Sequence, residues 1–437
     1  MNIVLLSGGS GKRLWPLSND VRSKQFLKLF KDEEGNYESM VQRVYRQITT
    51  VDPEAKVTIA TSKSQASAIK NQLGEKVSIC VEKCRRDTFP AIVLAAAYLH
   101  DELNVSSDES LIVCPVDPYV ENSYYETIQQ MGDLVKTGAA NLTLMGIEPT
   151  YPSEKYGYII PESGDAVSRV KEFKEKPDTA TAEKYLEKHA LWNGGVFAFR
   201  LGYLLDKAHS MLSFTDYRDL YAKYDSLTKI SFDYAVVENE ESIQVLRYHG
   251  DWKDVGTWNM MSEVMSEPTK GNVVLDDTCE RTQVVNELSI PIICMGCKDM
   301  VVAASGDGIL VADKDRSSSM KPYVEALDNT PMYEEKSWGT YELMDAAVGS
   351  RTAKVWIRSG KSMSYHGHEY RNEIWTIVSG TGIVYIDGME QEVAVGDVVT
   401  IAAGCKHMIT AKTDLQMVEI QLGQELSVTD KKKYMVE

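Results

Sequence analysis

The spacing of hydrophobic residues in the N-terminal half of the chain alternates between two periods. Short apolar runs, typical of buried strands, are followed by segments with helical spacing. Strand and helix in turn predict βαβ units and an α/β domain whose mixed, mostly parallel sheet has helices on both faces. The expected strands are 3–6, 57–60, 77–81, 111–114 and 142–146, and the expected helices are 40–48, 64–73, 90–103 and 124–136.

The pattern changes in the C-terminal part, where the helical period disappears. Short β-like pieces between residues 272 and 313 predict a small β module, and the serine- and proline-containing stretch 315–335 is typical of a linker. Glycine-rich turns then separate further short strands, as in a small antiparallel barrel. We therefore predict three segments: an α/β domain over 1–265, a β-rich module with its linker over 266–335, and a barrel over 336–437.

Composition excludes several classes of protein. The net charge of −17 argues against a nucleic-acid binder, because no broad basic surface is available to displace counterions. No apolar run is long enough to cross a bilayer, and the N-terminal run 3–6 resembles a strand and not a signal peptide. Seven scattered cysteines fit reduced thiols in the cytoplasm. Cys294 and Cys297 form a lone CxxC, which we interpret as packing cysteines and not as a zinc site.

A glycine-rich turn follows the first predicted strand. Ser7, Gly8, Gly9 and Gly11 lead into Lys12 and Arg13. Successive backbone N–H groups in such a turn can bind an anion, and glycine lets a phosphate approach the main chain. The spacing matches neither the Walker A loop nor GxGxxG, so the turn alone is equally compatible with an ordinary βα connection.

The residues that follow favour the phosphate loop. Trp15-Pro16-Leu17-Ser18 and Lys24-Gln25-Phe26-Leu27 complete a stretch that resembles the motif of the mannose-1-phosphate guanylyltransferases, in particular the long type with a C-terminal cupin. The resemblance implies a Rossmann-like nucleotidyltransferase domain in which Arg13 and Lys24 hold the nucleoside triphosphate. It also implies nucleotide contacts for Arg86, Asp87 and Thr88. The chain departs from the family in having Lys12 for Thr, Ser23 for Pro and Asp87 for Asn.

Transfer of a nucleotidyl group requires charge neutralisation and not a protein nucleophile. Mg²⁺ held by one or two carboxylates and phosphate oxygens supplies it. Asp117 ends an apolar strand, where a side chain enters the cleft, and Asp254 lies in Trp252-Lys253-Asp254-Val255-Gly256. An aspartate at a strand end is usually a turn or cap residue. Both positions match the family's metal ligands, so we expect them to bind Mg²⁺.

The resemblance also places a sugar-phosphate pocket between these two aspartates. In Lys171-Glu172-Phe173-Lys174-Glu175-Lys176-Pro177, Glu175 would accept sugar hydroxyls and Lys176 would pair with the phosphate. The alternative is a solvated charge run, which we expect for Lys171, Glu172 and Lys174. The remaining residues expected to line the sugar site are Tyr156, Gly157, Asn193, Gly194 and Asp233.

Three of the seven histidines lie near the C-terminus in a fixed pattern. Gly360, His366, His368, Glu373 and Gly380 have the spacing of the first cupin motif, and Gly396, Gly404 and His407 resemble the second. His366 and His368 are two apart on a strand and share one face. With Glu373 and His407 they would form a three-histidine, one-carboxylate site, but the ligands do not distinguish Zn, Fe, Mn and Ni.

Metal binding does not by itself make the barrel an isomerase. In bifunctional relatives the domain resembles mannose-6-phosphate isomerase, with an Arg after the last His; this chain has Met408 there. Aldose–ketose chemistry needs a cation near the developing enediolate. Arg371 remains, either paired with Glu369 or supporting the barrel, so we expect metal without efficient isomerisation.

The sequence therefore predicts an Mg²⁺-dependent enzyme whose catalytic residues are Arg13, Lys24, Asp117, Lys176 and Asp254. The resemblance implies transfer of GMP from GTP to mannose-1-phosphate, giving a GDP-sugar and pyrophosphate. Charge and hydropathy predict no nucleic-acid or membrane partner, and we expect a homo-oligomer, namely a dimer. Three alternatives stay open: a bifunctional enzyme with isomerase activity, a pyrophosphorylase for another sugar or base, and a non-catalytic sugar-phosphate sensor.

Overall fold

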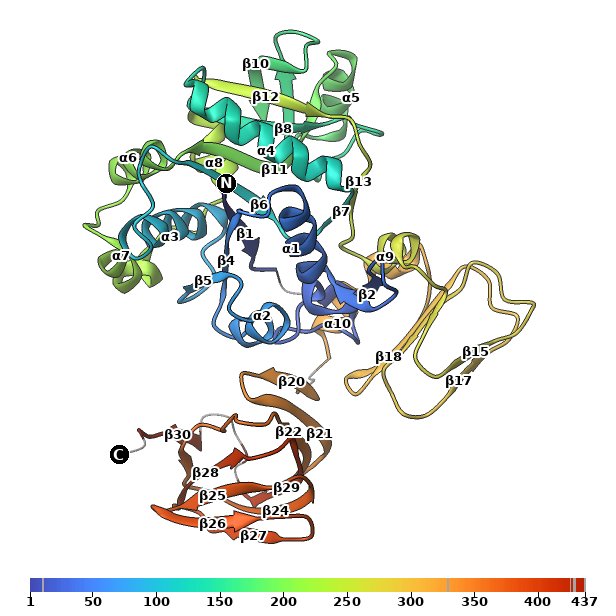
Figure 1. The fold of residues 1–437 in the computed structure, drawn as a ribbon. Helices are drawn as coiled ribbons and strands as arrows, with labels where there is room; N and C mark the ends of the chain where they lie inside the picture. Colours follow the sequence, from blue (N-terminus) through green and yellow to red (C-terminus); the bar gives the residue numbers. More distant parts are fainter. Residues whose placement is uncertain (10–11, 328–329, 425, 427–429, 436–437) are drawn as a thin grey trace. The chain divides into compact units, whose positions relative to one another are not determined.

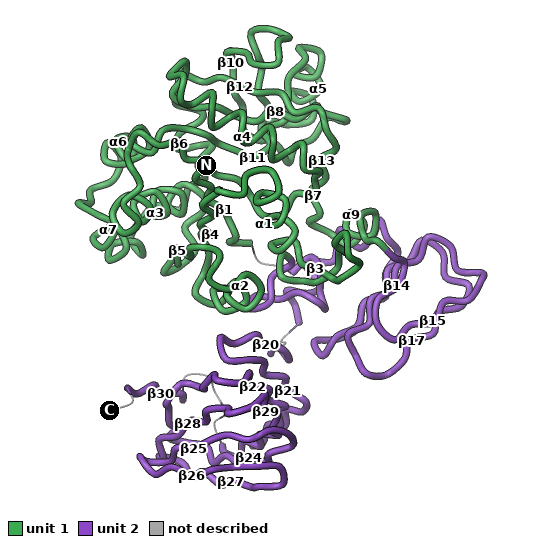
Figure 2. Tube along the Cα trace, viewed as in Figure 1, with its two compact units in different colours: residues 1–10, 25–266 green, residues 11–24, 267–437 purple. Residues whose placement is uncertain are grey.

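The computed structural model describes residues 1–9, 12–327, 330–424, 426 and 430–435. The chain divides into two compact units, shown in different colours in Figure 2. The first unit contains residues 1–10 and 25–266, and the second contains residues 11–24 and 267–437. The segment that carries Lys12, Arg13 and Lys24 thus groups with the C-terminal part of the chain, although it follows the first strand.

A nine-stranded mixed sheet forms the centre of the first unit (Figure 1). Its first four strands are parallel, and this half contains four of the five strands expected from the apolar runs. The fifth, β8, also forms, so the predicted α/β fold is confirmed. In order across the sheet the strands are β5 (Ser78–Glu82), β4 (Lys56–Ser62), β1 (Asn2–Ser7), β6 (Ser110–Pro115), β11 (Leu191–Arg200), β8 (Leu142–Ile147), β12 (Ile243–Tyr248), β10 (Val167–Lys174) and β9 (Tyr158–Pro161).

The other half of the sheet closes on itself, which the βαβ pattern does not predict. Strand β9 pairs with β10 and also with β11, so that β11, β8, β12, β10 and β9 form a ring. The register of β11 against β8 shifts between Asn193 and Phe197, where Gly195 has a φ of +69°. Such a bulge bends a strand and increases its twist, which helps β11 to meet two partners.

Helices pack on this sheet. Residues Phe89 to Ala97 of α3 are all buried, and most of them belong to the main core, because this helix is apolar around its whole circumference. No described helix is long and apolar enough to span a membrane. The α-helices of the first unit are α1 (Met40–Val51), α2 (Ala66–Leu73), α3 (Thr88–Asp101), α4 (Asn122–Thr137), α5 (Thr179–Glu187), α6 (Leu201–Met211), α7 (Tyr217–Lys223), α8 (Phe232–Ala235) and α9 (Trp258–Val264).

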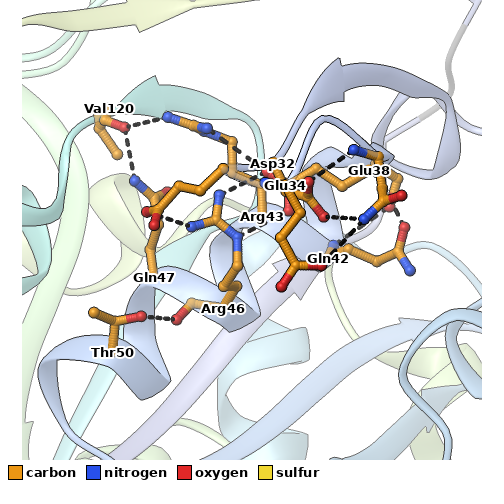
Figure 3. A network of polar contacts seen from close by, with 12 residues as sticks. Asp32, Glu34, Glu38, Gln42, Arg43, Arg46, Gln47, Thr50 and Val120 are labelled. Carbon is orange, nitrogen blue, oxygen red and sulfur yellow. Dashed lines mark hydrogen bonds and ion pairs between the residues drawn. The ribbon is translucent and has the colours of Figure 1, made fainter.

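A polar network ties α1 to two neighbouring strand segments (Figure 3). Arg46 donates two hydrogen bonds, of 3.1 and 2.7 Å, to the buried carboxylate of Glu38. The side chains of Gln47 and Arg43 donate to the carbonyl of Val120, at 3.0 and 3.4 Å. The helix thereby fixes the short strand that ends at Val120. The two segments are β3 (Tyr37–Ser39) and β7 (Pro118–Val120), and β3 pairs with β2 (Lys28–Lys31).

The β module of the second unit consists of stacked parallel coils. Strand β16 lies between β14 and β18, parallel to both, and β15 pairs parallel with β17. The segment 11–24 joins this module: Ser305 Oγ donates to the Pro16 carbonyl at 2.7 Å, and Arg22 pairs with Glu287 at 2.6 Å. The expected linker contains a short helix. The elements are β14 (Thr269–Lys270), β15 (Val273–Leu275), β16 (Gln283–Asn286), β17 (Ile292–Cys294), β18 (Met300–Ser305), β19 (Gly308–Asp313) and α10 (Lys321–Glu325).

The C-terminal barrel consists of two antiparallel sheets, as the short strands separated by glycine-rich turns predict. At one end its interior is apolar, around Trp375, Ile357 and Met417, and at the other it is polar. The first sheet runs β20 (Tyr333–Lys336), β21 (Gly339–Ala347), β22 (Ser350–Ile357), β29 (Leu415–Gly423), β24 (Arg371–Ser379), β27 (Val398–Ile401). The second runs β26 (Met389–Val393), β25 (Gly382–Ile386), β28 (Lys406–Ala411), β23 (His366–His368), β30 (Lys431–Lys433).

Candidate active site and candidate metal centre

The two aspartates expected to bind Mg²⁺ lie on neighbouring strands. Asp117 separates β6 from β7, and β7 pairs antiparallel with β13 (Trp252–Asp254). Asp254 is the register partner of Pro118, the residue that follows Asp117. Both aspartates are partly buried, and both carboxylates contribute, after burial, to a raised pKa of the nearby Tyr156 hydroxyl. Two carboxylates at the end of a central strand are the kind of oxygen ligands that Mg²⁺ prefers, so the residues fit this ion.

Glu175 and Lys176 form an ion pair that depends on a close backbone approach. Glu175 is 6 % exposed, and one of its oxygens lies 2.5 Å from where a Cβ on Gly157 would be. A Cβ at this position would require the Glu175 carboxylate or the Phe173 ring to move. Burial acts to lower the pKa of Lys176, but its contact with Glu175 outweighs this effect and raises the pKa. Lys176 therefore carries a positive charge, as pairing with a sugar phosphate requires.

Asn193 and Asp233 lie next to Glu175 and Gly157. The Asn193 amide donates to Asp233 Oδ1 at 2.7 Å, and its backbone N–H donates to the Gly157 carbonyl at 2.8 Å. Burial and the neighbouring Glu175 raise the pKa of Asp233 to about 7. The structure thus brings most of the expected sugar-site residues together, from segments far apart in the sequence.

Aromatic rings line this region, and of the four rings named below only Tyr156 was among the expected residues. The ring of Tyr156 lies 4.8 Å from that of Trp192 and 5.4 Å from that of Trp252, and Tyr151 lies 5.0 Å from Trp192. The expected Gly194 is packed against Ile147, where a Cβ would come within 3.2 Å. Trp252 lies in the same sequence motif as Asp254, and this proximity could have identified it as a residue of the site.

The first residues of the phosphate loop have well-defined partners. The Ser7 hydroxyl accepts a hydrogen bond from Gln25 at 3.0 Å, and the Gly9 carbonyl accepts one from Gln65 at 3.3 Å. Gly11 lies outside the described residues. Within the second unit, Lys12 pairs with Asp20 at 3.0 Å, and Arg13 is exposed. Nucleotide contacts by these residues and by Lys24 stay a prediction.

The Arg86, Asp87 and Thr88 segment forms the beginning of α3. Asp87, with a φ of +70°, caps the helix by accepting from the Thr88 N–H at 2.8 Å. The Thr88 hydroxyl accepts from the Phe232 N–H at 2.8 Å, and Arg86 donates to the Asp225 carbonyl. These contacts order a helix N-terminus, which carries partial positive charge. That Arg86, Asp87 and Thr88 contact a nucleotide likewise stays a prediction.

Glu82 borders the phosphate loop and was not among the expected residues. It ends β5, is 7 % exposed, and its Oε1 lies 3.8 Å from the position of a Cβ on Gly8. Burial raises the pKa of Glu82, and the Tyr224 hydroxyl donates to its other oxygen at 2.6 Å. In the sequence, Glu82 could have been identified as an acidic residue at the carboxyl end of a predicted parallel strand, where ligands bind in α/β sheets.

The four residues of the expected cupin metal site come together in the barrel. The ligand atoms of His366, His368, Glu373 and His407 lie within 4.8 Å of one another, and all four residues are buried. Glu373 Oε1 lies 3.1 Å from His368 Nε2, and Oε2 lies 3.3 Å from His407 Nε2. The strands β23, β24 and β28 supply them, as the spacing predicts.

The hydrogen bonds around this cluster fit a metal. Nδ1 of His366 contacts the Ser364 carbonyl at 2.6 Å, and Nδ1 of His407 contacts the Cys405 carbonyl at 3.1 Å. Both Nδ1 atoms must then carry the proton, which leaves each Nε2 with a lone pair. His407 Nε2 is buried without a hydrogen-bond partner beside a carboxylate oxygen, an arrangement that a bound cation would satisfy. Burial also lowers the pKa of His366 to about 3, so this imidazole is neutral, as a ligand must be.

A second row of polar side chains runs beside the cluster. Arg371 donates to Gln421 at 2.9 Å and to Asp430 at 3.2 Å, and Gln421 donates to Glu419 at 2.5 Å. Burial and the charge of Glu373 raise the pKa of Glu419 to about 8. Glu369 instead pairs with Lys432 at 2.8 Å. Of the two roles considered for Arg371, the structure thus supports the one within the barrel.

Comparisons with known proteins agree with this architecture. The nucleotidyl transferase family model matches residues 2–271, and the model of the mannose-6-phosphate isomerase C-terminal family matches residues 328–434. The chain belongs to the nucleotidyl transferase family and is an enzyme of that class.

Its full-length relatives include proteins named mannose-1-phosphate guanylyltransferase. It is 30% identical to a putative mannose-1-phosphate guanylyltransferase of Vibrio cholerae, over 98% of both chains. It is 29% identical to the mannose-1-phosphate guanylyltransferase of Escherichia coli, over 98% of this chain and 96% of the relative. A crystal structure from Thermus thermophilus, described as a mannose-1-phosphate geranyltransferase, aligns with a TM-score of 0.61 at 29% identity, over 74% of this chain and 98% of that one.

Proposed function

We propose that this enzyme transfers GMP from GTP to mannose-1-phosphate, forming GDP-mannose and pyrophosphate. The observation that carries the proposal is the pairing of β7 with β13, which sets Asp117 and Asp254 side by side next to Tyr156. The names of the full-length relatives support the base and the sugar.

The residues of the chain have distinct roles in this proposal. Asp117 and Asp254 would hold Mg²⁺, which when bound neutralises charge on the phosphates. Lys176 would bind the sugar phosphate and orient its oxygen for in-line attack on the α-phosphorus. Glu175, Asn193 and Asp233 would accept or donate hydrogen bonds to sugar hydroxyls. Arg13 and Lys24 would bind the triphosphate and stabilise the leaving pyrophosphate.

A substrate panel tests this proposal. Pyrophosphate release is measured with four nucleoside triphosphates, each paired with mannose-1-phosphate, glucose-1-phosphate and N-acetylglucosamine-1-phosphate. We expect the highest kcat/KM for GTP with mannose-1-phosphate. A preference for another pair would contradict the proposed specificity, and no release with any pair would favour a sensor.

The two proposed cation contacts are distinguished by complementary variants. Arg13→Ala should weaken the binding of GTP, and Lys176→Ala should weaken the binding of mannose-1-phosphate. Each variant loses a charge-assisted contact of about 1.5–3 kcal/mol, which corresponds to a roughly 10- to 100-fold loss of affinity. Steady-state KM and kcat for both substrates measure the effect. Lys174→Ala is the control, since this side chain is half exposed two residues from Lys176. Unchanged GTP kinetics in Arg13→Ala would mean that the loop is only a turn.

The barrel would hold one transition-metal ion on His366, His368, Glu373 and His407. We further propose a homodimer in the cytoplasm, where the cysteines would be thiols at rest, as they are in this structure. Size-exclusion chromatography with light scattering tests the dimer.

A further inference from the structure

Three of the seven cysteines meet at one corner of the β module. Cys294 ends β17 and Cys297 follows it, whereas Cys279 lies between β15 and β16, on the preceding coil. Figure 1 shows β15 and β17 side by side. Leu275 of β15 is the parallel partner of Cys294, and a bridge joins Glu280 to Lys298, the residues after Cys279 and Cys297. Stacking of the coils therefore places Cys279 next to Cys297.

The thiols at this corner contact one another. Cys294 is 7 % exposed, and its thiol lies close enough to that of Cys297 for this neighbour, after burial, to raise the pKa of Cys294, while the Cys297 thiol donates to the Met295 carbonyl at 3.7 Å. The Cys279 thiol donates to the Cys294 carbonyl at 3.4 Å and to the Asp276 carboxylate at 3.2 Å. All three side chains pack in the small core around Val284. The expectation of packing cysteines is therefore incomplete, because a third cysteine from another coil joins the CxxC pair.

The backbone around the thiols is held by hydrogen bonds between the coils. The Asp276 N–H donates to the Cys294 carbonyl at 3.1 Å, and the Glu280 N–H donates to the Cys297 carbonyl at 2.9 Å. Asp276 also accepts from the Gly296 N–H at 3.1 Å. Because Gly296, with a φ of +65°, provides the turn between Cys294 and Cys297, the two thiols are held together before any bond forms. Preorganised groups react as if at high effective concentration.

We propose that Cys294 and Cys297 form a reversible disulfide, with Cys279 as a neighbouring thiol that can exchange into it. This site is separate from the proposed transferase function. The oxidant is a low-molecular-weight disulfide of the glutathione class. The Cys297 thiolate attacks one sulfur of that disulfide and releases one thiolate; the Cys294 thiolate then attacks the Cys297 sulfur and releases the second. Two protein thiols become one disulfide, one glutathione disulfide becomes two glutathione thiols, and the two protons pass to the released thiolates.

The surroundings of the thiols determine how fast this exchange runs. Burial raises the pKa of Cys294, and burial likewise raises the pKa of Cys279. The attacking species is the thiolate, so exchange should be slow at neutral pH and faster as the pH rises. The site is therefore expected to respond to sustained oxidation and not to brief exposure.

Equilibration of the full-length protein with oxidised and reduced glutathione tests the proposal. After alkylation, peptide mass spectrometry should show a linkage between Cys294 and Cys297, and the number of titratable thiols should fall by two from seven. The double variant Cys279→Ser, Cys294→Ser should instead keep glutathione on Cys297, because no resolving thiol remains. Cys405→Ser, in the barrel, should behave as the unmodified protein.

Other results would overturn the inference. If oxidised wild-type protein carries only glutathione adducts or free thiols at these cysteines, the thiols do not reach one another. If purified protein contains zinc that keeps all three thiols unreactive until it is chelated, the corner is a metal site and not a disulfide site.

Discussion

Replacing Asp254 by Asn, and separately Asp117 by Asn, is expected to abolish nucleotidyl transfer while leaving the fold intact. The amide is close in shape to the carboxylate but loses the charge that holds Mg²⁺. Removing a metal ligand should cost several kcal/mol of transition-state stabilisation, so we expect kcat to fall by at least about 10³-fold. Neither side chain is fully buried, so the melting temperature should change little.

A neighbouring aspartate provides the control for this experiment. Asp251 precedes β13 by one residue and is exposed, so Asp251→Asn removes the same charge from the same strand connection without touching the aspartate pair. Pyrophosphate release over a range of Mg²⁺ concentrations separates weak metal binding from lost catalysis. Turnover like that of the wild type in both Asp254→Asn and Asp117→Asn at saturating Mg²⁺ would show that the metal is bound elsewhere.

The sequence predicts the position of each aspartate at the end of a segment, but not that the two meet. Asp117 follows an apolar strand whose register with β1 is set by burial on both faces. Asp254, by contrast, reaches the site through the three-residue strand β13, which has no recognisable pattern of its own. Pairing between segments so distant in the chain depends on tertiary packing, here on the network that anchors Val120 to α1.

Two further features show why local sequence patterns do not predict the whole fold and the whole site. The closed ring of strands depends on β11, which was not among the expected strands and which pairs with β6, β8 and β9. The contact of Glu175 with Gly157 depends on a side chain filling the space left by a missing Cβ, and sequence spacing does not show this. The cupin ligands were predictable because strand alternation alone puts His366 and His368 on one face.

The barrel is expected to bind about one transition-metal ion per chain and to lose it in the double variant His366→Ala, His368→Ala. Each histidine supplies a buried imidazole to the cluster, and two ligands of four are removed. Elemental analysis of purified protein measures the metal, and His249→Ala, which removes an exposed histidine, is the control for adventitious binding. Pyrophosphorylase activity should survive in the double variant, because the metal of the barrel has no role in nucleotidyl transfer. Protein that binds no metal under any reconstitution would make the barrel a structural domain.

Even with metal bound, conversion of mannose-6-phosphate to fructose-6-phosphate should be weak or absent. Met408 follows the last metal ligand, so the cation that stabilises an enediolate is missing from that position. Arg371 does not replace it, because its guanidinium is already bound to Asp430 and Gln421. Among the described residues, Lys431 is another cation close to the cluster, since its charge, after burial, lowers the pKa of His366. Coupled detection of fructose-6-phosphate measures the activity, and an efficient, metal-dependent isomerase that is lost in Lys431→Met would show that this lysine has taken the role of the arginine.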